Sequence, residues 1–276
     1  MNATKLTSTQ NETVKAAVKL RDRKGRDATG LTLLEGYREL TRAIEYGRKL
    51  EDCFFCPGQF LGVNEHELLE NLARHGVRLY EVPDFILTKL AYRDRPEGLI
   101  ATMRMTSHRL DDLPETENAF YLVAEAVEKP GNLGSILRSA DAAGADALIV
   151  CDKRTDIYNP NVIRASTGAL FAVPLALTET DELIPWLRKR NIQIVATSPH
   201  ATPLYTDVDL TGNIAIAVGT EQVGLSDQWL AEADISVQIP MLGKIDSLNV
   251  ATATTILLYE AARQRRWKCG TAKEKK

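Results

Sequence analysis

The chain has 276 residues and a mass of 30.6 kDa, enough for one large domain or two modest ones. Its hydrophobic fraction of 44% and charged fraction of 26% are ordinary for a globular protein and exclude a largely disordered or collagen-like chain. No apolar run reaches the roughly 18–20 residues that a membrane helix needs, and the polar N-terminus lacks a signal-peptide core. With four cysteines and no secretion signal, we expect a cytoplasmic protein.

The net charge of −3 is unevenly distributed along the chain. Residues 1–50 carry +5 and the last sixteen residues carry +6, so the middle of the chain carries −14. Two basic ends on an acidic body suit contact with a polyanion. A solvated helix face followed by a frayed tail would explain the same charges equally well.

The first hundred residues predict a small α/β unit. We expect a basic helix over 5–26, a helix that ends near Gly47, and a buried strand over 52–56. A helix over 65–75 then leads into strands at 77–82 and 99–105. The polar, proline-containing segment 107–118 shows no periodicity and predicts a linker. The expected domains are therefore residues 1–106 and 119–276.

From Phe120 onward, short apolar runs alternate with helices or loops. This alternation is typical of a parallel sheet with helices packed on it. A long final helix is expected from about Ser247 into the basic tail. The candidate strands cover residues 120–127, 146–150, 192–197, 213–219 and 235–240.

Several cofactor and metal motifs are absent from the sequence. No strand is followed by the G-x-G-x-x-G of dinucleotide sites, and no P-loop is present. The one C-x-x-C, at Cys53 and Cys56, has no second pair at a zinc-like spacing. We therefore interpret it as part of a buried strand and expect no metal site.

Three segments of the second region contain candidate site residues. In the first, Asn132 begins a helix whose apolar stripe leaves Arg138 roughly 140° away, so this arginine projects from the helix. In the second, a buried strand runs into Gly219, where glycine lets a ligand approach the backbone. In the third, Ser247 and Asn249 stand at a helix N-terminus. Each feature alone is also compatible with a structural role.

Together, in this order and spacing, the three segments resemble the SpoU family of RNA ribose 2′-O-methyltransferases in the SPOUT superfamily. The family's Asn and Arg, its G-x-E-x-x-G-L and its S-L-N motifs fall on Asn132, Arg138, Gly219, Glu221, Gly224, Leu225, Ser247, Leu248 and Asn249. The segment 159–171 is similar to the family's R-A-S-x-G stretch, at Arg164, Ser166 and Gly168. Gln222 stands where members commonly have glycine. Residues 28–105 resemble the small RNA-binding domain that many members carry in front.

The resemblance implies an α/β protein with two domains. A small α/β RNA-binding domain would precede a SPOUT methyltransferase domain that has a parallel sheet, a trefoil knot and the basic C-terminal tail. The implied cofactor is S-adenosylmethionine, bound in the knot loops by Thr197, Gly219, Ile239 and Leu248. The family also dimerises through the knotted domain, so the helix face near Leu257–Tyr259 is a candidate interface.

The resemblance further assigns roles to individual residues. The catalytic residues would be Arg138, Asn132, Glu221, Ser247 and Asn249. The basic residues that we expect to contact RNA are Arg21, Arg23, Lys24, Arg26, Arg38 and Arg164.

We therefore expect methylation of a ribose 2′-hydroxyl in structured RNA, with ribosomal RNA favoured over transfer RNA and with no metal or membrane involved. The alternative is a non-catalytic RNA-binding protein that retains the fold, and the presence of all five catalytic residues argues against it. A nucleotide-binding oxidoreductase is disfavoured because the glycine-rich motif is missing.

Overall fold

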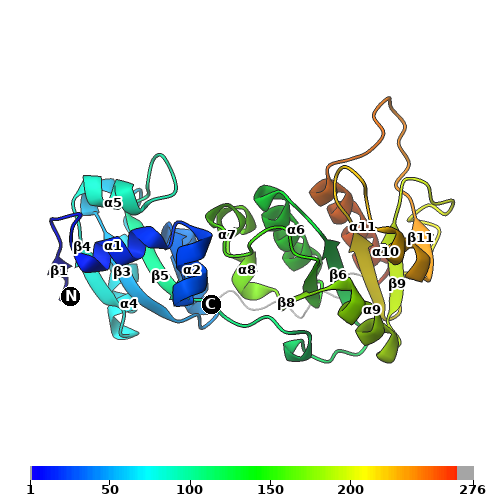
Figure 1. Ribbon diagram of the computed structural model, residues 1–276, viewed down its shortest axis with the longest axis horizontal. Helices are drawn as coiled ribbons and strands as arrows, with labels where there is room; N and C mark the ends of the chain where they lie inside the picture. Colours follow the sequence, from blue (N-terminus) through cyan, green and yellow to red (C-terminus); the bar gives the residue numbers. More distant parts are fainter. Residues whose placement is uncertain (1, 266–276) are drawn as a thin grey trace. The chain divides into compact units, whose positions relative to one another are not determined.

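The computed structural model describes residues 2–265, which form two compact units (Figure 1). The first unit contains the chain up to residue 107 together with residues 156–171. The second contains residues 108–155 and the chain from residue 172 onward. Most of the predicted basic tail, residues 266–276, lies outside the described residues.

The first unit is built on a five-stranded mixed sheet in the order β1-β4-β3-β5-β2. Strand β5 runs antiparallel to both β2 and β3, whereas β4 runs parallel to β1 and β3. The apolar side chains of Phe54 and Ile100, on the two central strands, pack with Leu87 in the core of this unit. The strands are β1 (Thr4–Lys5), β2 (Leu31–Glu35), β3 (Leu50–Phe55), β4 (Arg78–Glu81) and β5 (Leu99–Arg104), and the helices are α1 (Glu12–Lys19), α2 (Arg23–Thr29), α3 (Tyr37–Glu45), α4 (Glu65–Arg74) and α5 (Asp84–Leu90).

The single basic helix predicted over 5–26 is wrong, because the chain forms two helices there. Helix α1 ends at Lys19, a turn follows, and α2 begins after Asp22. This break turns Arg26 into the interior, where its side chain is 3% exposed. The predicted helix extended across the break because basic residues occur on both sides of it.

The segment between β7 and β8 contributes two short helices to the first unit. These helices are α7 (Pro160–Ser166) and α8 (Ala169–Ala172), and α7 packs on β2. Asp156, the first residue of the segment 156–171, forms an ion pair with Arg26 at 2.5 Å. By sequence these residues lie in the predicted domain 119–276, whereas their contacts in the structure are with the first unit. The long-range ion pair and the packing on β2 explain why they fold with the first unit.

The second unit contains a six-stranded sheet in the order β11-β9-β10-β6-β7-β8, with every neighbouring pair parallel. Helices cover both faces, as a parallel sheet requires: α9 and α10 pack on β9, while α6 packs with α11 over β7 and β10. The strands are β6 (Phe120–Glu125), β7 (Ala147–Cys151), β8 (Leu175–Thr178), β9 (Gln193–Thr197), β10 (Ile214–Val218) and β11 (Ile235–Val237), and the helices are α6 (Pro130–Ala143), α9 (Thr180–Lys189), α10 (Asp227–Glu232) and α11 (Val250–Gln264).

Part of the predicted linker is built into the second unit. The backbone N–H of Leu177 in β8 donates to the carbonyl of His108 at 2.8 Å, and Leu113 is buried in the core beside the sheet. These contacts explain why residues from 108 onward belong to this unit. Among residues 2–265, no helix is long and apolar enough to cross a bilayer.

Candidate active site

The candidate site lies at the carboxyl ends of four parallel strands. Strands β6, β9, β10 and β11 all end at the same edge of the sheet, and the loops that follow them contain the predicted site residues. Open α/β sheets bind their ligands at this edge. Three chain segments converge there: the start of α6, the loop after β10 and the start of α11.

Glu221, in the loop after β10, is the centre of a hydrogen-bonded cluster. Its Oε1 accepts a hydrogen bond from the side-chain amide of Asn132 at 2.8 Å and another from the amide of Asn249. Its Oε2 pairs with the ammonium group of Lys129. The three predicted residues Asn132, Glu221 and Asn249, up to 117 positions apart in sequence, therefore meet at one carboxylate.

Asn249 has two structural tasks in this cluster. Its Oδ1 accepts from the backbone N–H groups of Ala251 and Thr252, at 3.0 and 3.4 Å, and so caps α11. Its Nδ2 donates to Glu221 and also, at 3.1 Å, to Oδ1 of Asn132. The residue therefore ties the first turn of α11 to the first turn of α6.

The pKa of Glu221 lies below its usual value, first because of the bond from Lys129 and then because of the bond from Asn132. The side chain of Glu221 is 23% exposed and that of Lys129 is 69% exposed. The carboxylate is therefore ionised at neutral pH and already surrounded by donors. Such a group is suited to orienting neighbouring amides rather than to accepting a proton.

The loop after β10 requires glycine at its first position. A Cβ on Gly219 would lie 2.1 Å from both the carbonyl carbon and the carbonyl oxygen of Gly224. The chain folds back here, with the N–H of Thr220 donating to the carbonyl of Gly224 at 2.9 Å. Gly224 itself has φ +74°, which is strained for other residues. Gln222 is exposed on this loop, away from the tight approach.

The residues predicted to hold the cofactor surround the same edge. Thr197 ends β9, Gly219 directly follows β10, and Ile239 lies two residues beyond β11. Leu248 precedes Asn249 at the start of α11. The loop that ends there also exposes the apolar side chains of Leu242 and Ile245. Backbone N–H and carbonyl groups can bind the polar atoms of an adenosine, and apolar side chains can contact its base. The residues at this edge are therefore of the kinds that suit S-adenosylmethionine.

Two predicted catalytic residues lie outside the Glu221 cluster. Arg138 is six residues after Asn132, ~9 Å along the axis of α6. Its exposed side chain has no hydrogen bond or ion pair within residues 2–265, consistent with its predicted projection from the helix. Ser247 is exposed in the loop before α11 and likewise makes no side-chain hydrogen bond within the described chain.

Most of the predicted RNA-contacting residues are accessible. Arg26 is the exception: its guanidinium binds Asp156 and donates to the carbonyls of Leu20 and Arg21. This burial contradicts its predicted RNA contact, and Arg26 is a structural residue of the first unit. The exposed members of the predicted set are Arg21, Arg23, Lys24, Arg38 and Arg164.

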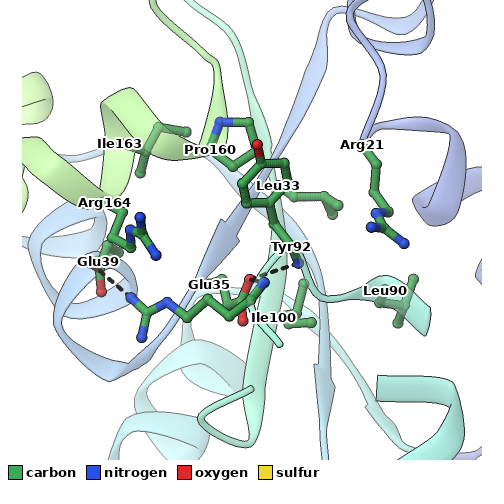
Figure 2. A pocket seen from close by; sticks show the side chains of 11 residues that line it. Arg21, Leu33, Glu35, Glu39, Leu90, Tyr92, Ile100, Pro160, Ile163 and Arg164 are labelled. Carbon is green, nitrogen blue, oxygen red and sulfur yellow. Dashed lines mark hydrogen bonds and ion pairs between the residues drawn. The ribbon is translucent and has the colours of Figure 1, made fainter. Parts of the chain in front are cut away.

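Arg21 and Arg164 lie on opposite sides of one hollow in the first unit (Figure 2). Leu33 and Tyr92 stand between them, and Tyr92 is 43% exposed. The arginines and the tyrosine thus bring positive charge and an aromatic face to one surface. Such a combination suits the phosphates and bases of RNA.

Carboxylates line the inner side of this hollow. Glu35 accepts from the backbone N–H groups of Tyr92 and Arg93, and the guanidinium of Arg93 pairs with Glu39 and Glu97. Burial raises the pKa of both Glu35 and Glu39, as the backbone bonds and Arg93 only partly offset it. These interactions fix the start of α3 against the segment that follows α5.

Sequence reasoning did not single out Lys129, although it completes the Glu221 cluster. A local signal was present, because Lys129 is the N-cap of α6, where a positive side chain opposes the helix dipole. The two cysteines of the C-x-x-C are buried at the end of β3, as interpreted from sequence. Residues 2–265 contain no group of three or more side chains suited to hold a metal ion.

The fold and the site together define a parallel α/β protein with a polar cluster at the carboxyl edge of its sheet. A model of the SpoU rRNA Methylase family matches residues 119–259, and a model of the MRM3-like substrate binding domain matches residues 11–101. The chain belongs to the SpoU rRNA Methylase family.

Relatives of known name cover nearly the whole chain. A 23S rRNA (uridine(2479)-2′-O)-methyltransferase of Streptomyces viridochromogenes is 33% identical over 89% of this chain and 87% of its own. A solved RNA 2′-O ribose methyltransferase is 43% identical, with a TM-score of 0.85, and covers 95% of this chain and 99% of its own. An AdoMet-bound rRNA methyltransferase from Sinorhizobium meliloti is 31% identical, with a TM-score of 0.86 over 95% and 98% of the two chains.

Proposed function

We propose that this protein transfers a methyl group from S-adenosylmethionine to a ribose 2′-hydroxyl of structured RNA, and that the RNA is ribosomal. The observation that supports this most directly is the meeting of Asn132, Glu221 and Asn249 at the carboxyl edge of the sheet. The family match and the relatives named as 23S rRNA 2′-O-methyltransferases support the reaction and the kind of RNA. An RNA substrate also makes chemical sense, since the 2′-hydroxyl is the group that DNA lacks.

When bound, S-adenosylmethionine supplies an electrophilic methyl group on a positively charged sulfur. The ribose oxygen forms a bond to the methyl carbon, the carbon–sulfur bond breaks, and the hydroxyl proton leaves to solvent. The chain must therefore align two partners and stabilise negative charge that develops on the ribose oxygen. Thr197, Gly219, Ile239 and Leu248 would hold the cofactor, mainly through backbone groups.

Arg138 is the proposed electrostatic stabiliser of the ribose oxygen. A guanidinium stays protonated because its pKa is above about 12, so it is a poor general base. It can instead hold the adjacent phosphate and the developing oxyanion. The exposed position of Arg138 on α6 leaves its side chain accessible to RNA.

The first unit is the proposed RNA-binding unit. Its exposed arginines around the Tyr92 hollow and its match to a substrate-binding domain support this role. Substituting Arg21→Ala together with Lys24→Ala should raise the KM for RNA while the affinity for S-adenosylmethionine stays unchanged. An equal loss of cofactor affinity, measured by calorimetry, would contradict this division of tasks.

We also propose a cytoplasmic homodimer whose subunits meet through a knotted second unit. The predicted interface helix is α11, but Leu257 and Leu258 are only 1% and 0% exposed within the single chain and are therefore core residues. Tyr259 is 40% exposed and Ile256 is half-buried, and this exposed part of α11 is the surface that we propose to face the partner subunit. Sedimentation at micromolar concentration should show a species of twice 30.6 kDa. A purely monomeric protein would contradict the dimer.

The function is tested directly by incubating the protein with labelled S-adenosylmethionine and ribosomal RNA. We expect label in the RNA, in alkali-resistant dinucleotides, because a 2′-O-methyl group blocks cleavage of the adjacent phosphodiester. Mapping ribose methylation in RNA from cells with and without the protein then identifies the nucleotide. RNA that binds but gains no label would favour the alternative, a non-catalytic RNA-binding protein.

A further inference from the structure

Lys129 is an unusual residue for the place that it occupies. It is the N-cap of α6, with φ −87° and ψ 120°, and its side chain makes no capping bond. Serine, threonine, aspartate and asparagine are preferred there, and a positive charge at a helix N-terminus opposes the helix dipole. Local helix stability therefore does not explain a lysine at this position.

The backbone next to Lys129 is held firmly in place. The hydroxyl of Thr155, itself 4% exposed, lies 2.7 Å from the carbonyl oxygens of both Val127 and Glu128. The carbonyl of Lys129 accepts from the N–H groups of Asn132 and Leu133, which begins the helix. The lysine side chain thus starts from a fixed point beside the Glu221 carboxylate.

Lys129 is the only donor to one oxygen of Glu221 within residues 2–265. The two asparagine amides both bind Oε1, whereas Oε2 pairs with the Lys129 ammonium alone. Without the lysine, the carboxylate would be held on one side and could rotate about its last bond. Rotation would displace both amides, and with them the first turns of α6 and α11.

We propose that Lys129 is a positioning residue for the methyl transfer. Its ammonium fixes the Glu221 carboxylate, which in turn fixes Asn132 and Asn249 and joins the starts of α6 and α11 into one rigid frame. The expected effect on turnover rests on the proposed function, but the ion pair between Lys129 and Glu221, here called the tie between the two side chains, is a separate claim. An ion pair with a 69% exposed ammonium contributes little to stability, so the effect should fall on turnover.

Charges on neighbouring elements set the expected pH effect. Two charged residues, Glu128 and Lys129, line the same hollow as Glu221, next to the start of α6. The other neighbours, Asn132 from α6 and Asn249 from the start of α11, are neutral. The bond from Lys129 is the largest cause of the lowered pKa of Glu221. Removing Lys129 takes away the cation that is bonded to Glu221. The pKa of Glu221 should then rise, and the acid limb of the rate profile should move to higher pH.

The test compares Lys129→Met and Lys129→Arg, with Lys189→Met as a control at an exposed lysine of the same unit on α9. We expect Lys129→Met to lower kcat roughly 10- to 100-fold, the range for a displaced catalytic frame, with little change in the KM for RNA or in Tm. Lys129→Arg should restore most of the rate because it keeps a cationic donor. Lys189→Met should behave like wild type. A raised KM with unchanged kcat would make Lys129 a phosphate contact and overturn the proposal.

A second measurement does not depend on catalysis. Carboxyl carbon NMR of Glu221 should report a higher pKa in Lys129→Met than in the wild type and in Lys189→Met. An unchanged Glu221 titration would refute the tie between the two side chains, whatever the activity. Wild-type protein that shows the expected titration but never methylates RNA would instead refute the proposed function and leave the tie in place.

Discussion

Substitutions of Asn249 separate the two tasks of this residue. Asn249→Ala removes both the cap of α11 and the donor to Glu221, whereas Asn249→Asp keeps the capping oxygen and loses only the donor. Aspartate is also favoured at a helix N-terminus by the dipole, although it brings a second carboxylate against Glu221. The two variants should therefore differ in stability while both lose activity.

The magnitudes follow from the contacts. Loss of the cap should cost about 1 kcal/mol, and loss of the hydrogen bonds to Glu221 and Asn132 about 1 kcal/mol more at this exposed position. A loss of about 2 kcal/mol corresponds to a fall in Tm of about 4–8 °C for a protein of this size. Asn249→Asp should lose less than half of that. Both variants should lower kcat by roughly 10²-fold, since Asn132 and Glu221 lose their common partner.

The assay pairs thermal unfolding with methylation of ribosomal RNA at saturating cofactor. Asn11→Ala is the matched control, because Asn11 caps α1 through the N–H of Thr13 at 2.9 Å and takes no part in the site. It should lose about 1 kcal/mol of stability and retain its turnover. Wild-type turnover in Asn249→Asp would refute the argument that the amide donor organises the site.

Three further predictions test other parts of the structure. Arg138→Ala should lower kcat roughly 10²-fold or more, with the fold and the cofactor affinity retained. Partial rescue by Arg138→Lys would favour an electrostatic role over a geometry that only guanidinium provides. A wild-type rate in Arg138→Ala would remove this residue from the mechanism. Gly219→Ala should abolish binding of S-adenosylmethionine in calorimetry, because the new Cβ would lie 2.1 Å from the backbone of Gly224, whereas Gly212→Ala, with no atom within 4 Å, should bind normally. Burial raises the pKa of the Cys151 thiol to about 12 and that of Cys53 further. Iodoacetamide at pH 8 should therefore modify these two thiols only in unfolded protein. Rapid labelling of the native protein at either position would show that the strands open.

The sequence by itself determined the type of fold and the motifs of the site. Local patterns carry this information, because the apolar stripe of α6, the buried runs of β6, β7 and β10, and the cap at Asn249 each involve neighbours within one element. The approximate strand positions in the second unit followed from these patterns. Strand β8 is the exception in the second unit, and β1 and β2 were likewise not predicted in the first, although strands as short as β11 were.

Only the tertiary structure decided which residues meet. Lys129 pairs with a carboxylate 92 positions away, and Arg26 with one 130 positions away, so the partner of neither residue is contained in its local sequence. The first contact adds a residue to the site, and the second removes a predicted RNA contact and ties residues 156–171 to the first unit. A local pattern reports only how a residue relates to its own helix or strand. Ion pairs between distant segments form only after the sheets have set those segments side by side, and for that reason the partners of Lys129 and Arg26 became visible only in the folded chain.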